Sequence, residues 1–560
     1  MLQDLYTPRG ETLKDTPWDS YPRPQMKRDS FLNLNGQWDF SAEDYKGKIL
    51  VPFCPESSLS GVKRHFTEGA KLTYSRTFTL PENFNKGRVL LHFGAADQHL
   101  RCFINEKKVG THIGGYTAFS FDITDALTEG ENEIRCECFD DLRNQLHPYG
   151  KQTMKRGGMW YTPVSGIWQT VWLESVPETH IEKLHIENKH NYVEISVEPA
   201  LSGKVTVKDL GEFTLREGTL SISHENLHLW SPEAPYLYEF TVETDADKVD
   251  SYFAARTIES KIVDGIPRLC LNGKPYFFHG LLDQGYWPEG IYTPPAPESF
   301  ADDILEMKKL GFNTLRKHIK VEPEEFYYQC DKLGMVVFQD MVNNSDYSFF
   351  RDTLLPTFGL QKLNDKYLHS DENSRQMFIQ TMEKTVWQLK NHPCILYWTI
   401  FNEGWGQFDS DRIYALLRKL DNTRVIDSTS GWFRRNRSDV ESLHIYFNFW
   451  HRLKPHKQRP LVLSEFGGFA LPVEGHIFNP DNAYGYKNCK SLEDFQAAFE
   501  KLYRQRILPA IDKGLCAAIY TQVSDVEDEI NGILTYDRKV NKGCQEAMQA
   551  LAEDLQKATK

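Results

Sequence analysis

The sequence lacks the features that mark secreted and membrane proteins. Its 560 residues contain no apolar run long enough to cross a bilayer, and the opening segment MLQDLYTPRGETLKD has neither the basic start nor the apolar stretch of a secretion signal. Basic side chains are also too few for a nucleic-acid partner, because phosphate binding relies on Lys and Arg and the formal net charge is -13. We therefore predict a cytoplasmic protein that binds neither membranes nor nucleic acids.

Cysteine signatures are missing as well. The ten cysteines show no CxxC spacing, so the pattern predicts reduced, mostly buried thiols rather than a zinc site or a disulfide framework. We predict no metal and no cofactor. Aromatic residues are plentiful, at 13% of the chain, and they suit both packed β-sandwiches and surfaces that stack against sugar rings.

The length predicts several domains, because 560 residues exceed what one ordinary core holds. From about residue 30 to 176, short alternating runs separated by Gly, Asn and Pro predict an antiparallel, jelly-roll-like β-sandwich, which we assign to residues 1–177. Residues 178–258 repeat this style in a smaller unit, as in YVEISVE and LYEFTVET, and predict an immunoglobulin-like β-sandwich without its disulfide.

The pattern changes after about residue 260. Strand-like runs such as GMVVFQD, ILYWTIFNE and LVLSEFGG alternate with amphipathic helices such as SFADDILEMKKLG. This alternation is typical of a parallel α/β barrel, so residues 259–560 are predicted to form a (β/α)8 TIM barrel. Side chains at the carboxyl ends of barrel strands face the active site, so polar residues there are candidates for chemistry.

Two of the predicted barrel strands end in a glutamate. The run ILYWTIFNEGW delivers Asn402 and Glu403 to the rim, and RPLVLSEFGG delivers Glu465. Burying a carboxylate costs free energy, so a converging pair indicates acid and base catalysis. Glycoside cleavage with retention needs such a pair roughly 5 Å apart, one protonating the leaving oxygen and the other attacking the anomeric carbon. Asn402 is placed to hydrogen-bond the 2-hydroxyl of a sugar.

FNEGW with a downstream SEFGG resembles the two signatures of glycoside hydrolase family 2, which includes β-galactosidases, β-glucuronidases and β-mannosidases. The resemblance covers essentially the whole chain, including YPRPQMKRDSFLNLNGQWDF, LWSPEAPYLY and GFNTLRKH. It implies that Glu403 is the acid/base, that Glu465 is the nucleophile and that Asn402 is the asparagine before the acid. Arg316 and His318 match a structural arginine and a sugar-contacting histidine. Relatives commonly form dimers or tetramers, so the resemblance implies a homo-oligomer.

Other polar and aromatic residues near strand ends are candidates for substrate binding. Asp283 and Trp287 in LLDQGYWPEG either line the pocket or form a tight turn packed on its own aromatics. Tyr446 either bonds the nucleophile, as a tyrosine does in the family, or belongs to the core. Tyr520 stands where relatives often have tryptophan, and we expect it to reshape a stacking wall. Glu527, like its neighbour Asp525, either reads sugar hydroxyls or is a solvated rim charge.

The sugar is predicted less directly. Family glucuronidases clamp the sugar carboxylate with an Asn-x-Lys motif, whereas this chain has Glu529, Ile530 and Asn531 at that place. A glutamate there would repel a uronate, which favours a neutral substrate. Basic residues point the other way, because an arginine such as Arg434 could hold a galacturonide carboxylate; the other members of this set are Lys317, Lys320, Arg435 and Arg437.

We therefore predict a retaining exo-β-glycosidase that resembles β-galactosidase and acts on a carbohydrate or glycoside substrate. A β-uronidase, either β-galacturonidase or β-glucuronidase, is one alternative. The MVVFQD element resembles the mannosidase branch and leaves β-mannosidase as another. A carbohydrate-binding protein that kept the fold and lost catalysis is the alternative from a different functional class.

Overall fold

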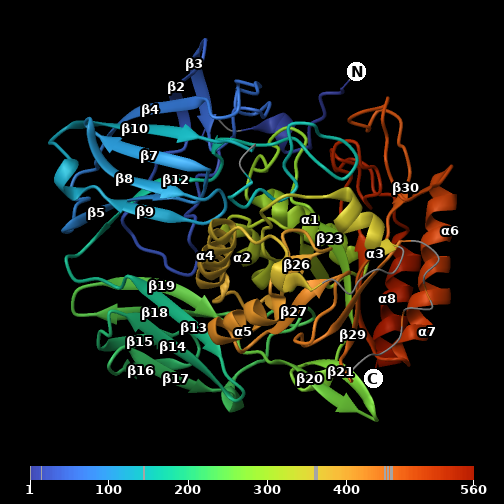
Figure 1. Cartoon of the computed structure of the whole chain (residues 1–560). Coiled ribbons are helices and arrows are strands. Elements are labelled where there is room, and N and C mark those ends of the chain that lie inside the picture. Colours follow the sequence, from blue (N-terminus) through green and yellow to red (C-terminus); the bar gives the residue numbers. More distant parts are fainter. Residues whose placement is uncertain are drawn as a thin grey trace.

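The computed structural model describes residues 2–13, 16–142, 145–357, 364–446, 450, 453 and 458–559. Two all-β units stand beside a larger α/β unit (Figure 1). The chain runs from the blue sandwich at the upper left, through the green sandwich below it, to the barrel at the right. Of the helices in the described residues, none has both the length and the apolar character that a membrane span requires.

The first unit is a sandwich of two antiparallel sheets. A six-stranded sheet, in the order β3-β2-β4-β10-β7-β8, packs against a four-stranded sheet in the order β1-β12-β5-β9. Along β10 every second side chain is buried, including Ile134 and Cys136, because successive strand residues point to opposite faces. The elements are η1 (Gly10–Thr12), β1 (Phe31–Asn33), β2 (Gly36–Ala42), β3 (Tyr45–Val51), β4 (Lys71–Thr79), β5 (Arg88–Phe93), β6 (Ala96–Asp97), β7 (His99–Ile104), β8 (Lys107–Ile113), β9 (Phe119–Asp122), η2 (Thr124–Ala126), β10 (Glu131–Phe139), β11 (Gly166–Ile167) and β12 (Val171–Val176).

The second unit is a smaller sandwich, with sheets in the orders β13-β14-β17 and β16-β15-β18-β19. Its core contains apolar side chains from both sheets, such as Ile195 and Val242. All ten cysteines of the chain are free and nine are buried, so neither sandwich depends on a disulfide. The elements are β13 (Lys183–Asn188), β14 (Tyr192–Glu198), β15 (Gly203–Val207), β16 (Gly211–Leu215), β17 (Thr219–Ser223), η3 (His224–Asn226), β18 (Tyr238–Thr244) and β19 (Lys248–Phe253).

The third unit is built on eight parallel strands, in the order β27-β26-β25-β24-β23-β32-β29-β28. Ser430 at the end of β27 hydrogen-bonds His444 of β28, which joins the two outer strands and closes the sheet into a barrel. The strands are β23 (Phe278–Asp283), β24 (Thr314–Lys317), β25 (Val336–Asp340), β26 (Ile395–Asn402), β27 (Val425–Ser430), β28 (Glu441–Ile445), β29 (Leu461–Gly467) and β32 (Leu515–Thr521).

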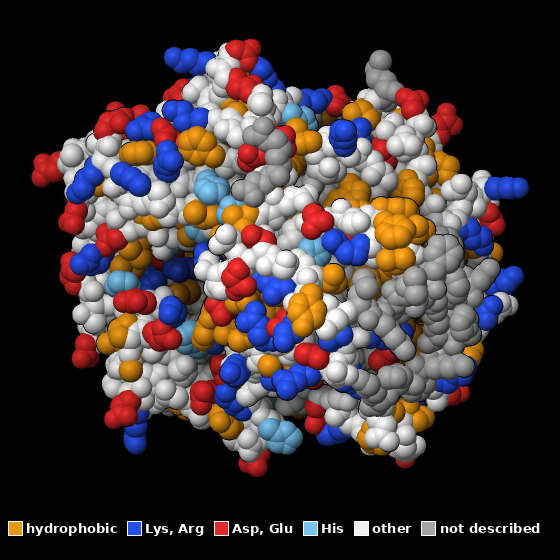
Figure 2. Space-filling model, in the orientation of Figure 1, with side chains coloured by type: hydrophobic (Ala, Val, Ile, Leu, Met, Phe, Trp, Pro, Cys, Tyr) orange, Lys and Arg blue, Asp and Glu red, His pale blue; other side chains and the backbone are white. Residues whose placement is uncertain are grey.

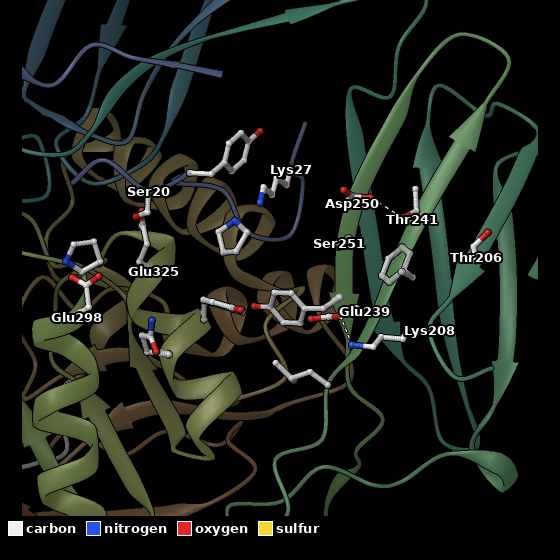
Figure 3. Close-up of a pocket in the computed structure, with 18 residues that line it drawn as sticks. Ser20, Lys27, Thr206, Lys208, Glu239, Thr241, Asp250, Ser251, Glu298 and Glu325 are labelled. Atoms are coloured by element: carbon white, nitrogen blue, oxygen red, sulfur yellow. Dashed lines mark hydrogen bonds and ion pairs between the residues drawn. The ribbon is translucent and has the colours of Figure 1, made fainter. Parts of the chain in front are cut away.

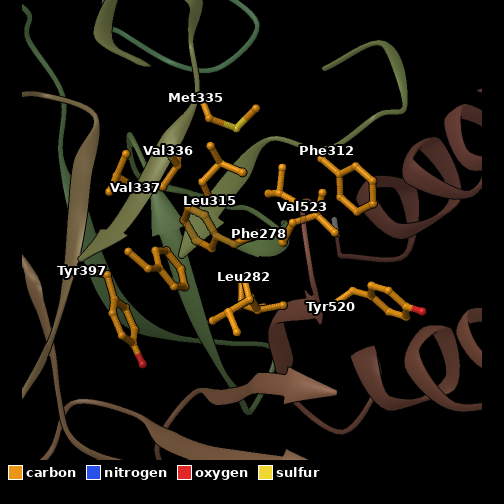
Figure 4. Close-up of a cluster of buried hydrophobic side chains, with 14 of the residues drawn as sticks. Phe278, Leu282, Phe312, Leu315, Met335, Val336, Val337, Tyr397, Tyr520 and Val523 are labelled. Atoms are coloured by element: carbon orange, nitrogen blue, oxygen red, sulfur yellow. The ribbon is translucent and has the colours of Figure 1, made fainter. Parts of the chain in front are cut away.

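Helices cover the outside of the barrel, so its strands are buried on both faces. Figure 4 shows Phe278, Leu282 and Tyr397 in the packed core, with Tyr520 turned away from them toward the helices. The helical elements are α1 (Glu298–Lys309), α2 (Glu324–Leu333), η4 (Phe349–Leu354), α3 (Leu355–Thr357), η5 (Asp365–Tyr367), α4 (Glu372–Leu389), α5 (Ser410–Leu420), α6 (Leu492–Leu502), η7 (Tyr503–Ile507), α7 (Leu508–Ile511) and α8 (Gln545–Thr559). The remaining strands are β20 (Ile258–Val263), β21 (Ile266–Leu271), β22 (Lys274–Pro275), β30 (Phe469–Ala470) and β31 (Lys487–Asn488).

The predicted fold class is confirmed: two antiparallel β-sandwiches precede a parallel (β/α)8 barrel. The predicted boundary after residue 177 falls between β12 and β13. The predicted boundary after residue 258 falls at the start of β20, in a hairpin that precedes the first barrel strand.

A cavity of about 690 Å³ separates the second sandwich from the barrel. Figure 3 shows it between the amino-terminal segment that carries Ser20 and Lys27, the sandwich strands that carry Glu239 and Asp250, and the helices that carry Glu298 and Glu325. None of its lining residues belongs to a barrel strand. On the face in Figure 2, acidic and basic side chains are interspersed rather than gathered by sign.

Candidate active site

The carboxyl ends of β26 and β29 bring two glutamates together at the barrel mouth. Asn402 is the last residue of β26, and Glu403 follows it with a backbone φ of 50°. Glu465 lies within β29. One carboxylate oxygen of Glu403 and one of Glu465 lie within 4.8 Å of each other. This spacing is close to that of the carboxylates in retaining glycosidases, about 5 Å.

The two carboxylates have different surroundings. Both oxygens of Glu465 accept hydrogen bonds, one from Arg316 Nη1 at 3.0 Å and one from the Tyr446 hydroxyl at 2.5 Å. Burial raises the pKa of Glu465, but the charges of His444 and Arg316 outweigh it and hold the pKa well below its usual range. The Glu403 side chain is 14% exposed, against 6% for Glu465. Glu465 is therefore an ionised, fixed carboxylate, while the Glu403 side chain is the more exposed of the two.

Arg316 at the end of β24 organises the inner wall of the mouth. Its guanidinium is 1% exposed and donates to Asp340, Glu465, the Ser464 carbonyl and Asn402 Oδ1, at 2.9 to 3.0 Å. Because Arg316 occupies Oδ1 of Asn402, the amide nitrogen Nδ2 faces away from it. Nδ2 is buried and has no partner among the described residues. It is thus a free donor beside Glu403, where a sugar hydroxyl would lie.

His318 follows Arg316 on the same face of the chain. Its Nδ1 lies 2.7 Å from Asp340 Oδ2. Burial, with a smaller contribution from the nearby charge of Lys151, lowers the pKa of His318 to about 4. The imidazole is therefore neutral near pH 7, and a neutral ring that donates through Nδ1 keeps Nε2 as an acceptor for a substrate hydroxyl.

His444 lies between the two glutamates, and the sequence reasoning missed it. Its Nδ1 is 2.8 Å from Glu403 Oε1 and 3.5 Å from Glu465 Oε2, and its Nε2 is 2.9 Å from Ser430 Oγ. The signal was present in SLHIYFN, because His444 and Tyr446 are two residues apart and so share one face of the extended chain.

A loop from the first sandwich completes the mouth, and the sequence reasoning missed this too. Lys151 is 7% exposed, and its ammonium lies 5.8 Å from the ring centre of Trp405 and 5.5 Å from that of Tyr161. No hydrogen bond or ion pair joins this ammonium to a described residue. Trp160 stacks on Trp405 with ring centres 5.3 Å apart. These residues lie some 250 positions from Glu403 in sequence and in another domain, so sequence spacing could not connect them.

The tyrosine predicted to form a stacking wall lies elsewhere. Tyr520 is fully buried on the outer face of β32, where its hydroxyl accepts a hydrogen bond from the Phe469 amide and its ring contacts Phe499 of α6. Its neighbour Thr521 faces inward and hydrogen-bonds Tyr446. Strand alternation turns this side chain into the core, and substrate contact by Tyr520 stays a prediction that this placement does not support.

Asp283 and Trp287 also lie outside the mouth. Asp283 pairs with Lys317 at 2.6 Å, on the outer side of β23. Trp287 lies in a tight turn closed by two backbone hydrogen bonds with Ile291, and its ring packs on Phe300 of α1. Of the two predicted alternatives, the structure contains the packed turn, and substrate contact by Asp283 and Trp287 stays a prediction without structural support.

Four of the five basic residues proposed to hold a sugar carboxylate have acidic partners, namely Arg434, Arg435, Lys317 and Lys320. Arg434 pairs with Glu441, an outward-facing residue of β28. Arg435 pairs with Asp365. Lys320 donates to backbone carbonyls and to Glu322, a carboxylate that Lys317 also contacts. Each of these cations already has an acidic partner, and substrate binding by Arg434 stays a prediction that this pairing does not support.

The acidic loop after β32 holds the sandwich loop against the barrel. Glu527 is buried and accepts hydrogen bonds from the Thr162 amide, and burial raises its pKa to about 7. Asp525 is buried against Lys542. Glu529 accepts hydrogen bonds from Tyr161 and from Asn531. Glu527 is therefore a buried residue that anchors a loop rather than a solvated rim charge, and its contact with sugar hydroxyls stays a prediction.

Glu403, His444 and Glu465 also have the spacing of a cation site. Arg316 and Tyr446 already donate to the two oxygens of Glu465, and a guanidinium beside a shared ligand opposes a second positive charge. The residues present therefore suit proton transfer better than metal binding.

Comparison with known proteins places most of residues 61–554 in one family. Residues 61–177 match the description "Glycosyl hydrolases family 2, sugar binding domain", residues 176–256 "Glycosyl hydrolases family 2" and residues 266–554 "Glycosyl hydrolases family 2, TIM barrel domain".

The relatives carry two different names. The chain is 25% identical to a β-galactosidase of Thermoanaerobacter pseudethanolicus over 499 residues, which are 80% of this chain and 62% of that protein. It is also 25% identical to the β-glucuronidase of Homo sapiens, over 80% of this chain and 75% of that protein. The chain thus spans less than two thirds of the length of the bacterial β-galactosidase.

Solved structures with the same fold include uronidases. A β-D-glucuronidase of Dictyoglomus thermophilum superposes with a TM-score of 0.74 at 18% identity, covering 96% of this chain and 98% of that one. A β-galacturonidase of Eisenbergiella tayi bound to galacturonate gives a TM-score of 0.69 at 19% identity, covering 96% and 99%. At these identities the likeness concerns the fold alone.

Proposed function

Because the chain belongs to glycosyl hydrolases family 2, we propose that it is a retaining exo-β-glycosidase that removes a terminal β-linked sugar by double displacement. The observation that carries the proposal is the pair Glu403 and Glu465, with oxygens within 4.8 Å at the barrel mouth and unlike surroundings. A retaining mechanism needs one group that gives and takes a proton and one that stays ionised.

In the first step, a Glu465 oxygen bonds to the anomeric carbon as the bond to the leaving oxygen breaks. Glu403 gives its proton to that oxygen, and a covalent glycosyl ester on Glu465 results. Arg316 and Tyr446 hold the attacking carboxylate in place. In the second step, Glu403 takes a proton from water as the water oxygen displaces Glu465 from the anomeric carbon, so the β configuration is restored.

The site contains buried hydrogen-bond donors that substrate hydroxyls can satisfy. Asn402 Nδ2 and Trp405 Nε1 are buried donors without partners among the described residues. A buried donor without a partner costs about 1–3 kcal/mol, and a bound sugar would supply the missing acceptors. The contact between Asn402 and the 2-hydroxyl strengthens as positive charge develops on the ring.

Two classes of sugar are candidates for the substrate, a neutral β-galactoside and a β-uronide. The expected preference for a β-galactoside rested on Glu529 repelling a uronate, yet Glu529 is hydrogen-bonded to Tyr161 and Asn531. Lys151 favours the second candidate, a β-uronide, because a buried ammonium that has no ionic partner among the described residues attracts a sugar carboxylate. The β-mannoside alternative loses support from Gln339, whose amide is used by Tyr327 and by backbone carbonyls.

A panel of aryl β-glycosides tests the proposal. Galactoside, glucuronide, galacturonide and mannoside are compared with wild type, Glu465→Gln and Glu403→Gln, and the anomer released is followed by NMR. We expect the β-anomer to form first and Glu465→Gln to lose at least about 10⁴-fold in kcat. Release of the α-anomer first would contradict retention, and sugar binding without turnover by wild type would favour the silent binding protein.

The sugar candidates are separated by Lys151→Met, with the exposed Lys155 of the same loop changed to Met as the matched control. If the substrate is a uronide, Lys151→Met lowers its kcat/KM by about 10² because a charge-assisted hydrogen bond is lost. Galactoside turnover that is equal in wild type and Lys151→Met would assign the neutral sugar.

A further inference from the structure

His444 connects the two catalytic glutamates with the interior of the barrel. The imidazole is fully buried, and its Nδ1 faces Glu403 Oε1 at 2.8 Å and Glu465 Oε2 at 3.5 Å. Both neighbours are carboxyl groups, and Glu465 is ionised because its pKa lies well below its usual range. A bare nitrogen lone pair facing two acceptors would be repelled, so Nδ1 carries a hydrogen.

Hydroxyl groups support the opposite nitrogen. Nε2 lies 2.9 Å from Ser430 Oγ, which is 2.9 Å from Ser464 Oγ and 3.4 Å from Ser442 Oγ. A hydroxyl can both donate and accept, so Ser430 can satisfy Nε2 whether or not that nitrogen carries a hydrogen. The three serines come from β27, β28 and β29, and they fix the plane of the imidazole against three strands at once.

We propose that His444 is a positioning residue that serves both half-reactions through one N–H group. Nδ1–H donates to Glu403 Oε1, which leaves Oε2 as the oxygen that carries the catalytic proton to and from the substrate. The inference rests on the proposed retaining mechanism and extends it to a residue that touches neither sugar nor leaving group.

The same N–H group follows the negative charge through the cycle. Before the first step, Glu465 is charged and Glu403 holds the proton, so Nδ1–H lies between an ionised and a neutral acceptor. When the ester forms, Glu465 becomes neutral and Glu403 gives its proton to the leaving oxygen and becomes charged. Nδ1–H then donates to an ionised Glu403, and hydrogen bonds to charged groups are roughly twice as strong as neutral ones. No proton leaves His444 at either step.

The position of the group explains why it favours the reaction rather than substrate binding. A hydrogen bond that strengthens as Glu403 loses its proton stabilises the transition state of the first step more than the ground state, and such an interaction raises kcat/KM for that step. Substrates whose leaving oxygen needs a proton gain most from it. Substrates with an acidic phenol as leaving group need little protonation and gain little in the first step.

The test is the dependence of kcat/KM on the leaving group in wild type, His444→Leu and His444→Asn, measured with aryl glycosides of the preferred sugar over a range of phenol acidities. We expect His444→Leu to lose about 10² in kcat/KM on poor leaving groups and less than about threefold on dinitrophenyl glycosides, which steepens the dependence. His444→Asn places an amide N–H near the position of Nδ1 and should recover about tenfold of the loss.

A matched control separates this effect from damage to the barrel. His279 is an equally buried histidine on the outer face of β23, bonded to the Gly311 carbonyl and to Tyr503. We expect His279→Leu to lower the unfolding temperature without changing the leaving-group dependence. An equal loss on every leaving group in His444→Leu, or no recovery in His444→Asn when both variants are folded, would overturn the proposal.

Two further outcomes keep the inference apart from the proposed function. A wild type that turns over no glycoside would contradict the function, whereas an active wild type with an unchanged dependence in His444→Leu contradicts only the role of His444. Activity that disappears on adding EDTA and returns with a divalent cation would assign Glu403, His444 and Glu465 to a metal and overturn the proposal.

Discussion

Arg316 and Lys317 are neighbours on β24, both cationic and both 1% exposed, and they build two different parts of the molecule. Arg316 points into the barrel and binds Asp340, Glu465 and Asn402 at the mouth. Lys317 points outward and binds Asp283 and Glu322 beneath the covering helices. The inner network positions the candidate catalytic residues, while the outer network attaches loops to the barrel.

The difference teaches that the face of the strand decides the role of a polar residue at a strand end. Side chains alternate between faces along a strand, so one step in sequence separates a residue of the site from a residue of the scaffold. Thr521 beside Tyr520 and Asp340 beside Gln339 repeat the contrast: the first of each pair faces the mouth, and the second contacts the outer shell.

The largest expected difference is between substitutions of these two neighbours. Arg316→Met should lower kcat by about 10³ or more, because Glu465 loses a charged partner that holds and stabilises it. Lys317→Met should lower the free energy of unfolding by about 3–5 kcal/mol, because Asp283 loses its lysine partner and Glu322 keeps only Lys320. Steady-state kinetics and urea unfolding of both variants measure the two effects.

Arg316→Lys sharpens this contrast, since it keeps the charge but loses the planar fork that serves four partners at once. We expect it to remain at least about 10²-fold below wild type. If Lys317→Met is folded and loses as much kcat as Arg316→Met, the claim that the outer network contributes to stability and not to catalysis is contradicted.

The tyrosines Tyr446 and Tyr520 give a smaller contrast of the same kind. Tyr446→Phe removes a hydrogen bond to Glu465 and should lower kcat about 10²-fold. Tyr520→Phe leaves the Phe469 amide without an acceptor and should cost about 1–3 kcal/mol of stability, with kcat within about threefold of wild type. Thermal unfolding and kcat measured side by side decide whether the two hydroxyls differ in this way.

Protonation of Glu465 should lower both the stability of the fold and kcat/KM at acid pH. The folded pKa of Glu465 is lowered from 4.5 to about 2, so its ionisation stabilises the fold above pH 4.5 and that stability is lost as pH falls toward 2. The acidic limb of kcat/KM should therefore lie below pH 4.5, and Tyr446→Phe should move it upward. Lys317→Met should leave the limb in place, because Asp283 and Glu322 are not at the mouth.

The smallest expected effect belongs to Arg434. Its guanidinium pairs with Glu441 on the outer face of β28, so Arg434→Ala should change kcat/KM by less than about twofold on any sugar of the panel. A loss of kcat/KM on uronides alone would indicate that Arg434 contacts the substrate, and it would contradict the placement of this residue outside the mouth.

Much of the fold followed from the sequence because it depends on period. Alternation along β10 and buried runs such as β26 and β29 predict sandwiches and a barrel without reference to distant residues. The family was predicted from FNEGW and SEFGG and is confirmed. Glu403 and Glu465 were predicted because strand ends in a barrel converge wherever they lie in sequence, and the structure brings them together.

Two things could not be predicted from the sequence. One is which side chains of a barrel strand point inward, and the other is that a loop of the first sandwich lies at the barrel mouth. Substrate contact by Asp283 and Tyr520 stays a prediction without structural support, because both side chains turn outward. The same holds for Trp287, which packs on Phe300, and for Arg434, which pairs with Glu441. Lys151 and Trp160 were missed because their loop belongs to the first sandwich. Oligomeric state and localisation stay predictions.

The central claim is that Glu465 forms a bond to the anomeric carbon of the sugar while Glu403 donates and accepts the proton. The most direct measurement is to incubate the protein with an activated 2-deoxy-2-fluoro glycoside of the preferred sugar, which slows hydrolysis of the ester, and to locate the attached sugar by peptide mass spectrometry. We predict one sugar per chain, on the peptide that contains Glu465, and none in Glu465→Gln. A sugar attached to a different carboxylate, or an active enzyme that accumulates no adduct and releases the inverted anomer, would contradict the account.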